Sequence, residues 1–135
     1  MNTKPVLTLE TAQRVAAAAE IEAQQNNWRV VIAVVDDGGH LLYLQRNHDT
    51  QFGSIETAIQ KARAAVAFKR PTKMSEDAVL SGRLIHLALP GVVPAEGGVP
   101  LLLEGVVVGG LGISGVRSLQ DGQIAAAGVA ALEQT

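Results

Sequence analysis

The sequence contains no cysteine among its 135 residues. This absence excludes disulfide bridges, thiolate zinc sites, cysteine-ligated iron–sulfur clusters and a cysteine nucleophile. Aromatic residues make up only 3% of the chain, so the core has to be built from Ala, Val, Leu and Ile. Because apolar residues reach 47% and the mean hydropathy is +0.21, we expect some apolar surface to be buried between subunits and predict a homo-oligomer.

The sequence also lacks an excess of positive charge, since eleven Lys and Arg stand against thirteen Asp and Glu. A nucleic-acid partner is therefore not expected, because phosphate backbones are bound through surplus basic residues. No apolar run reaches the length of a membrane span, and the N-terminal stretch MNTKPVLTLETAQ lacks the apolar core of a signal peptide. We expect a cytoplasmic protein with no membrane partner, folded as one domain over residues 1–135.

Periodicity predicts a helix followed by a hairpin in the N-terminal third. Apolar residues at helical spacing begin after Thr8, a suitable N-cap, and stop at Asn26-Asn27. The run 29–35 is continuous and β-branched, which is typical of a strand buried on both faces. The turn 36–39 (Asp-Asp-Gly-Gly) leads into a returning strand over 40–46, so the two strands should pair as an antiparallel hairpin.

The middle of the chain predicts two helices and a long loop. A helix begins near Ser54, carries a well-formed apolar stripe and ends at Pro71. Ser75 is expected to cap a short helix over 76–80. The stretch 90–100, PGVVPAEGGVP, is rich in Gly and Pro, and long shaped loops of this kind are more often functional than accidental.

The C-terminal third predicts a second hairpin over 101–108, with Glu104-Gly105 at its turn, then a last strand over 106–115 and a helix. Ser118 and Asp121 fit a capping pair for that helix. Hairpins imply antiparallel pairing, and strands buried on both faces imply helices on both sides. The prediction is an α+β fold, an α/β/α sandwich around an antiparallel sheet of about five strands.

The glycines of the stretch 106–115 fit the spacing G-x-G-x-x-G of a dinucleotide-binding turn. That fingerprint needs a following strand that ends in an acidic residue about 20 residues further on, and here only a predicted helix follows. No nucleotide cofactor is therefore expected. The simpler interpretation is that Gly109, Gly110 and Gly112 let a helix, another backbone or a ligand lie close against the strand.

The three histidines are His40, His48 and His86, and no two of them have metal-ligand spacing. For His40 and His48 a solvated side chain is the favoured interpretation. His86 lies among apolar neighbours in LIHLAL, where a hydrogen-bonded, partly buried histidine is favoured. A haem would nevertheless accept such a residue as an axial ligand.

Basic residues lie near one predicted strand end and along one predicted helix: Arg46, Lys61, Lys69 and Arg70. A solvated face is the favoured interpretation. If these residues converge near the Gly/Pro loop, they would suit a small carboxylate or haem propionates. No complete catalytic constellation emerges from the sequence.

Short motifs occur in order along nearly the whole chain and together resemble the GlcG/HbpS-like family: VVDDGGHLL (34–42), Lys61-Ala62, Pro71-Thr72, GGVPL (97–101), GLGISG (110–115) and Gln120-Asp121. The resemblance implies a profilin-like fold with a five-stranded antiparallel sheet, oligomers and haem binding, with haem degradation in some members. Other members are encoded beside glycolate-utilisation genes or are fused to cobalamin adenosyltransferase domains.

The resemblance also marks candidate ligand-binding residues, some of which could instead be architectural: Asp36, Arg46, Lys61, Thr72, Gly97, Gly98, Pro100, Gly115 and Asp121. Two stretches depart from the family pattern. The loop after the second strand reads Arg46-Asn-His-Asp-Thr50 where relatives tend to have Arg-Met-Asp-Gly-Ala, and Gly122 stands where relatives often have a glutamate.

The leading hypothesis is a protein that binds a small ligand, with haem or a related tetrapyrrole as the expected ligand and cofactor, and degradation of haem as a further expectation. A second hypothesis is action on a small hydroxy or keto acid, for which Asp36 and Lys61 are the candidate acid/base residues. A third is an accessory or assembly protein without a ligand.

Overall fold

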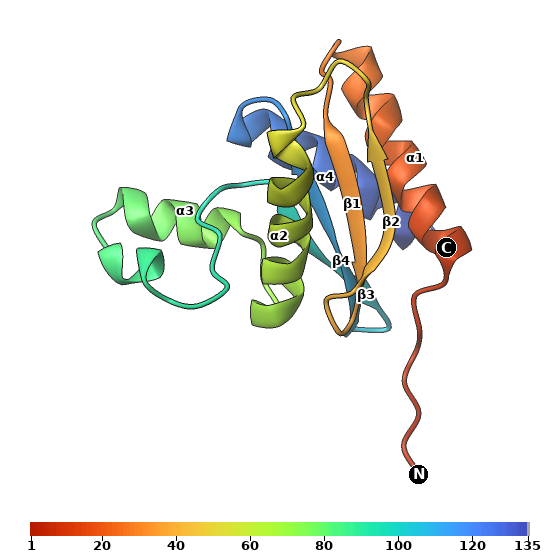
Figure 1. The fold of residues 1–135 in the computed structure, drawn as a ribbon. Helices are drawn as coiled ribbons and strands as arrows, with labels where there is room; N and C mark the ends of the chain where they lie inside the picture. Colours follow the sequence, from red (N-terminus) through yellow and green to blue (C-terminus); the bar gives the residue numbers. More distant parts are fainter. Residues whose placement is uncertain (135) are drawn as a thin grey trace.

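Helices cover both faces of a four-stranded antiparallel sheet in the computed structural model, which describes residues 1–134 (Figure 1). The sheet has the order β2-β1-β4-β3 and consists of β1 (Val31–Asp36), β2 (Leu41–Arg46), β3 (Gly98–Leu103) and β4 (Val106–Ser114). Helices α1 (Leu9–Gln25) and α4 (Ser118–Glu133) lie on one face, and α2 (Gly53–Phe68) lies on the other. This arrangement confirms the α+β class.

The first hairpin forms as predicted, and its inner strand is buried on both faces. Residues of β1 alternate between the two layers: Ile32 and Val34 belong to the core formed with α1 and α4, while Val31 and Ala33 pack against α2. All four side chains are fully buried, so the continuous β-branched run corresponds to a central strand of the sheet. The N-cap prediction also holds, since Thr8 Oγ1 accepts from the Thr11 N–H at 3.2 Å.

The prediction of five strands is wrong. The returning strand of the second hairpin and the glycine-rich stretch after it are one continuous strand, the nine-residue β4. Its start, Val106, pairs with Leu103 of β3 across the turn at Glu104-Gly105, and its end, Ser114, pairs with Val31 of β1. A single long strand therefore serves two neighbours, and the described residues contain four strands.

The glycines of β4 allow a very close helix–strand contact, as the sequence predicted. A Cβ at Gly112 would overlap the carbonyl oxygen of Ala58, and a Cβ at Gly110 would overlap that of Ala62. Both carbonyls belong to α2, so the backbone of this helix lies directly on the strand. Side chains at these positions would push the helix away from the sheet.

An arm formed by α3 (Lys73–Leu80) and the 3₁₀ helix η1 (Leu84–Leu87) extends away from the sheet beside α2 (Figure 1). Ser75 is not the cap of its helix, because α3 begins two residues earlier, after Thr72. The loop that follows is also shorter than predicted. Gly98 already pairs with Gly112 of β4, so β3 starts inside the stretch expected to be loop.

None of the helices formed by residues 1–134 combines the length and the apolar character that crossing a bilayer requires.

Candidate functional site

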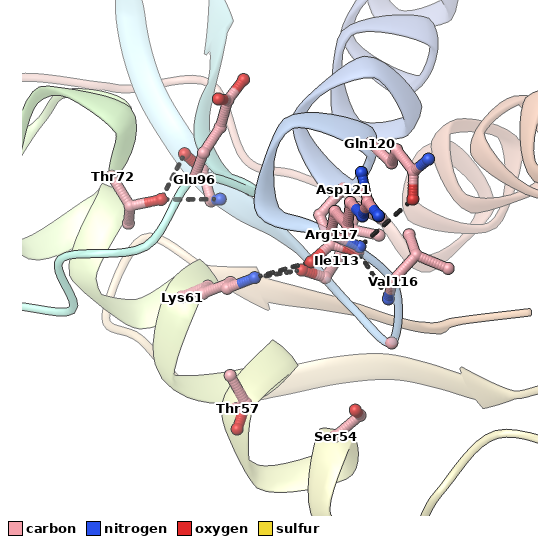
Figure 2. Close-up of polar contacts among 12 residues, drawn as sticks. Ser54, Thr57, Lys61, Thr72, Glu96, Ile113, Val116, Arg117, Gln120 and Asp121 are labelled. Atoms are coloured by element: carbon pink, nitrogen blue, oxygen red, sulfur yellow. Dashed lines mark hydrogen bonds and ion pairs between the residues drawn. The ribbon is translucent and has the colours of Figure 1, made fainter. Parts of the chain in front are cut away.

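A buried ion pair joins α2 to α4 (Figure 2). The Lys61 ammonium donates to Asp121 Oδ2 at 3.0 Å and to the carbonyl oxygen of Ile113, near the end of β4, at 2.9 Å. The backbone N–H of Val116 donates to the other carboxylate oxygen of Asp121 at 3.3 Å. Lys61 is 3% exposed and Asp121 is 2% exposed, so almost all of both charges is removed from water.

Asp121 therefore has a different role from the capping role that its sequence position suggested. Arg117 is the N-cap residue of α4, and the Gln120 side chain accepts from the Arg117 N–H at 3.2 Å. Asp121 points into the protein toward Lys61 instead. Burial raises the pKa of Asp121 to about 6, while the charge of Lys61, its hydrogen bond and the Val116 N–H act in the opposite direction.

The glycine pair 97–98 lies directly against this ion pair. A Cβ at Gly97 would lie 2.6 Å from the Ile113 carbonyl oxygen and 2.9 Å from Lys61 Nζ, in a backbone conformation (φ +132°) that disfavours side chains. A Cβ at Gly98 would overlap the Lys61 carbonyl oxygen. Thr72 fixes this segment, because Thr72 Oγ1 accepts from the Gly98 N–H and the Thr72 N–H donates to the Gly98 carbonyl, each at 2.9 Å.

Five of the candidate residues thus form one group: Lys61, Thr72, Gly97, Gly98 and Asp121. The group is closed to solvent, since each of these residues is buried. The contacts of this group join the 97–98 segment to α2 and α4. Because a buried charge pair is favourable only in a good geometry, these contacts restrict how the three elements can be arranged.

Glu96 is a member of this region that the sequence analysis did not identify. Its carboxylate lies where a side chain at Gly122 would stand, because a Cβ at Gly122 would overlap Glu96 Oε2. The Glu96 N–H donates to Glu76 Oε1 of α3 at 3.0 Å. The loop therefore places an acidic side chain beside the beginning of α4, at Gly122.

Asp36 lies at a different place and has a local role. Its Oδ1 accepts from the N–H groups of Gly38 and His40, both at 2.9 Å. The hydrogen bond from the His40 N–H has the largest effect on the pKa of Asp36, and together with that from Gly38 it holds this pKa below its usual value. Asp36 pairs with Gly109 in the sheet, whereas Lys61 contacts Ile113. Four residues along a strand separate the two by roughly 13 Å, so they form no acid/base pair.

The remaining candidates also lie outside the Lys61 group. Arg46 donates to the Thr50 carbonyl at 3.0 Å, and Gly115 lies against the same loop, since its Cβ would come 3.2 Å from Thr50 Cγ2. Pro100 lines an open apolar groove between β3 and α4. The basic residues do not converge: Lys61 is buried, Arg46 is at the loop, and Arg70 stacks over the Phe68 ring at 5.7 Å.

His86 lies in an open concavity between α3 and η1. As the sequence indicated, it is half-buried and hydrogen-bonded, with Nδ1 3.3 Å from Ser75 Oγ. The concavity has a volume of about 490 Å³, within the range of small-molecule sites, and is lined by Arg70, Met74, Ala78, Arg83, Ile85, His86 and Leu89. It therefore combines one imidazole, two guanidinium groups and apolar side chains.

Sequence reasoning missed Arg83 and Ser75 as neighbours of His86. The turn at residues 81–83 folds η1 back toward α3. No local sequence pattern predicts this contact between η1 and α3. Among residues 1–134, no group of three or more His, Asp and Glu side chains is arranged to hold a metal ion.

Comparisons with known proteins agree with this description. A family profile described as "Haem degrading protein HbpS-like" matches residues 7–130. Protein GlcG of Escherichia coli K12 is 42% identical over 114 residues, covering 84% of this chain and 85% of GlcG. The crystal structure of Klebsiella pneumoniae protein ORFY has a TM-score of 0.88 at 31% identity and covers 100% and 98% of the two chains.

A crystal structure of a PduOC–haem complex is also similar, with a TM-score of 0.83 at 36% identity over 94% of this chain and 95% of that one. The profile spans most of the described residues, and the relatives share both sequence and fold. The chain therefore belongs to the HbpS-like family, together with GlcG.

Proposed function

We propose that this protein binds haem or a related tetrapyrrole in the concavity between α3 and η1. The observation that carries the proposal is the donor set of this concavity, in which the His86 imidazole stands beside two arginines and an apolar wall. Support also comes from the family description, which names haem, and from the similar PduOC structure, which is a haem complex.

The imidazole of His86 suits a haem iron. Because Nδ1 is hydrogen-bonded to Ser75 Oγ, the ring is oriented and Nε2 is left to act as a ligand. The half-buried position keeps one side of the ring accessible from the concavity. A histidine whose other nitrogen is held in this way is the usual proximal partner of haem iron.

The two arginines suit the propionates of a tetrapyrrole. The Arg83 guanidinium forms no hydrogen bond or ion pair with another residue of 1–134, and Arg70 is held over the Phe68 ring, so both guanidinium groups can pair with carboxylates. Met74, Ile85 and Leu89 offer apolar contact for the macrocycle. Haem, when bound, supplies the oxygen chemistry that degradation requires, and these residues supply orientation and access.

The test is a haemin titration followed by absorbance in the Soret region. The wild type should bind about one haem per subunit, and His86→Ala should change the Soret spectrum and weaken binding at least ~tenfold. His48→Ala is the matched control, because His48 is an exposed histidine outside the concavity. A linear, non-saturating rise that is the same in all three proteins would contradict the proposal.

Degradation is tested on the same complex with reductant and oxygen. If the protein degrades haem, the Soret band should fall faster than for free haem under the same conditions. An equal or slower fall would restrict the function to binding.

The proposal includes self-association through the arm. Large apolar side chains stand out from it, with Leu80 at 78%, Leu84 at 63% and Leu87 at 62% exposure. A second copy of the chain is the occupant that we propose for this surface, because the aromatic-poor chain has a positive mean hydropathy and leaves these leucines uncovered.

A further inference from the structure

A hollow outside the Lys61 group lies between α2 and the turn that joins β1 to β2. It has a volume of about 620 Å³, and it is lined by Asp37, Gly38, Gly39, Gln60, Arg63, Ala64, Val66, Ala67 and Gly91. None of these residues lines the concavity that contains His86. The hollow is therefore a separate place on the protein, and the proposed haem site does not use it.

Small residues form most of its wall. The α2 face contributes Ala64 and Ala67, the turn contributes Gly38 and Gly39, and the following loop contributes Gly91. Gly39 and Gly91 both have positive φ values, +82° and +80°, which explains glycine at these two positions independently of any ligand. The result is nevertheless a wall along which a small molecule can approach backbone atoms closely.

Three polar side chains line the hollow: the cation Arg63 and two residues with acceptor oxygens, Gln60 and Asp37. The Arg63 guanidinium forms no hydrogen bond or ion pair with another residue of 1–134, although it lies beside the turn. Gln60 donates its amide N–H to Glu56 Oε1 at 2.7 Å, which leaves its own carbonyl oxygen available. Asp37 Oδ2 accepts from Lys4 at 2.6 Å, which leaves Oδ1 available.

We propose that this hollow binds a small organic carboxylate that also carries a hydroxyl group. Arg63 pairs with the carboxylate, because a guanidinium matches two carboxylate oxygens through charge-assisted hydrogen bonds. The hydroxyl donates to the free oxygen of Asp37 or Gln60, a hydrogen bond that an acid without a donor group cannot form. The small residues of the wall accommodate the short carbon chain.

Three matched probes separate the two contacts: lactate has both groups, propionate has only the carboxylate, and lactamide has the hydroxyl without the charge. Isothermal titration calorimetry with the wild type should show saturable binding of lactate, weaker binding of propionate, and no binding of lactamide. Equal responses to lactate and lactamide would overturn the role of Arg63 in pairing with a carboxylate.

Variants at the exposed Arg63 keep the fold intact and locate the site. Arg63→Leu should weaken lactate binding at least ~tenfold, and Arg63→Lys should retain part of it. The matched control is Arg14→Leu, since Arg14 is an exposed arginine of α1 that lines neither hollow. Lactate should bind this control as it binds the wild type.

Amide resonances give a second measurement that does not depend on substitution. Lactate should shift the signals of Gly39 and Gly91, which line the hollow, and should leave Gly53, at the start of α2, unchanged. Unchanged signals at both lining glycines, or undiminished binding by Arg63→Leu, would overturn the proposal. Haemin titration of Arg63→Leu should match the wild type, so failure here is distinguishable from failure of the haem proposal.

Discussion

At the scale of single residues, the Lys61–Asp121 pair determines how the centre of the molecule responds to substitution. Both charges are buried, and each depends on the other for compensation. Lys61→Met leaves the Asp121 carboxylate buried without a counter-charge. The free energy of unfolding at pH 7.5 should fall by about 3 kcal/mol or more, measured by urea denaturation.

The same experiment at pH 5 supplies the internal check. Because Lys61 lowers the pKa of Asp121, its removal raises that pKa further, and Asp121 is then neutral at pH 5. The loss of stability should therefore shrink at pH 5. Lys73→Met, at an exposed pair with Asp77, should leave the urea midpoint unchanged. A loss at Lys61 that is independent of pH would contradict the account.

Asp121 also gives the wild type a defined pH dependence. The unfolded chain releases this proton near pH 3.8, whereas the folded protein holds it up to about pH 6. Between these values the folded state binds more protons, so the free energy of unfolding falls as the pH rises through the window. The contribution is present below pH 3.8 and is lost by about pH 6.

The measurement compares the wild type with Asp121→Asn in urea at several pH values between 4 and 6. The wild type should lose roughly 2 kcal/mol relative to the variant over this range. Subtracting the variant isolates Asp121 from Asp36, whose lowered pKa acts in the opposite sense. Parallel curves would show that Asp121 has an ordinary pKa in the folded protein.

At the scale of elements, the contact between α2 and β4 is the most demanding piece of packing. Gly112→Ala should lower the free energy of unfolding by at least about 2 kcal/mol, because the new methyl group overlaps the Ala58 carbonyl. Gly53→Ala is the control, since Gly53 begins α2 and has open space around it. It should be neutral or stabilising by up to about 1 kcal/mol in thermal and urea unfolding.

The elements themselves were largely predictable from the sequence because their signals are local. The first helix, the first hairpin and the close approach to β4 follow from an N-cap, a β-branched run and a row of glycines. The start of β3 was not predictable in this way. Its Gly-Gly-Val-Pro sequence is typical of a loop, and only the pairing of Gly98 with Gly112 and Thr72 makes it a strand.

The candidate site was less predictable because its contacts join distant parts of the chain. Lys61 and Asp121 are 60 positions apart, and a capping role explained Asp121 equally well from local sequence. One signal was available: Lys61 lies at helical spacing from Ala58 and Ala65, two fully buried residues of α2. A charge on that face has to be compensated inside the protein.

At the scale of the whole molecule, the arm of α3 and η1 should decide the association state. Replacing both Leu84 and Leu87 by Asn removes apolar surface that is already exposed, so the fold should be unaffected. The variant should be smaller than the wild type by light scattering, with an unchanged circular dichroism spectrum. Lys69→Asn, at an exposed residue outside the arm, should behave as the wild type.

Two further outcomes bear on that prediction. A wild type that is monomeric at micromolar concentration would remove the proposed interface. An oligomer that persists in the double variant would assign association to another surface, such as the apolar groove lined by Pro100 and Leu102 between β3 and α4.

The position of the Glu96 carboxylate over Gly122 links the histories of two sites that are far apart in the sequence. A side chain at 122 and the present placement of Glu96 exclude each other. A descendant that gains a side chain at 122 has to redirect the Glu96 side chain, which rotation about its own bonds can achieve because no backbone atom is involved. Across related sequences, positions 96 and 122 should therefore change together, so that an acidic side chain comes either from the loop or from the helix.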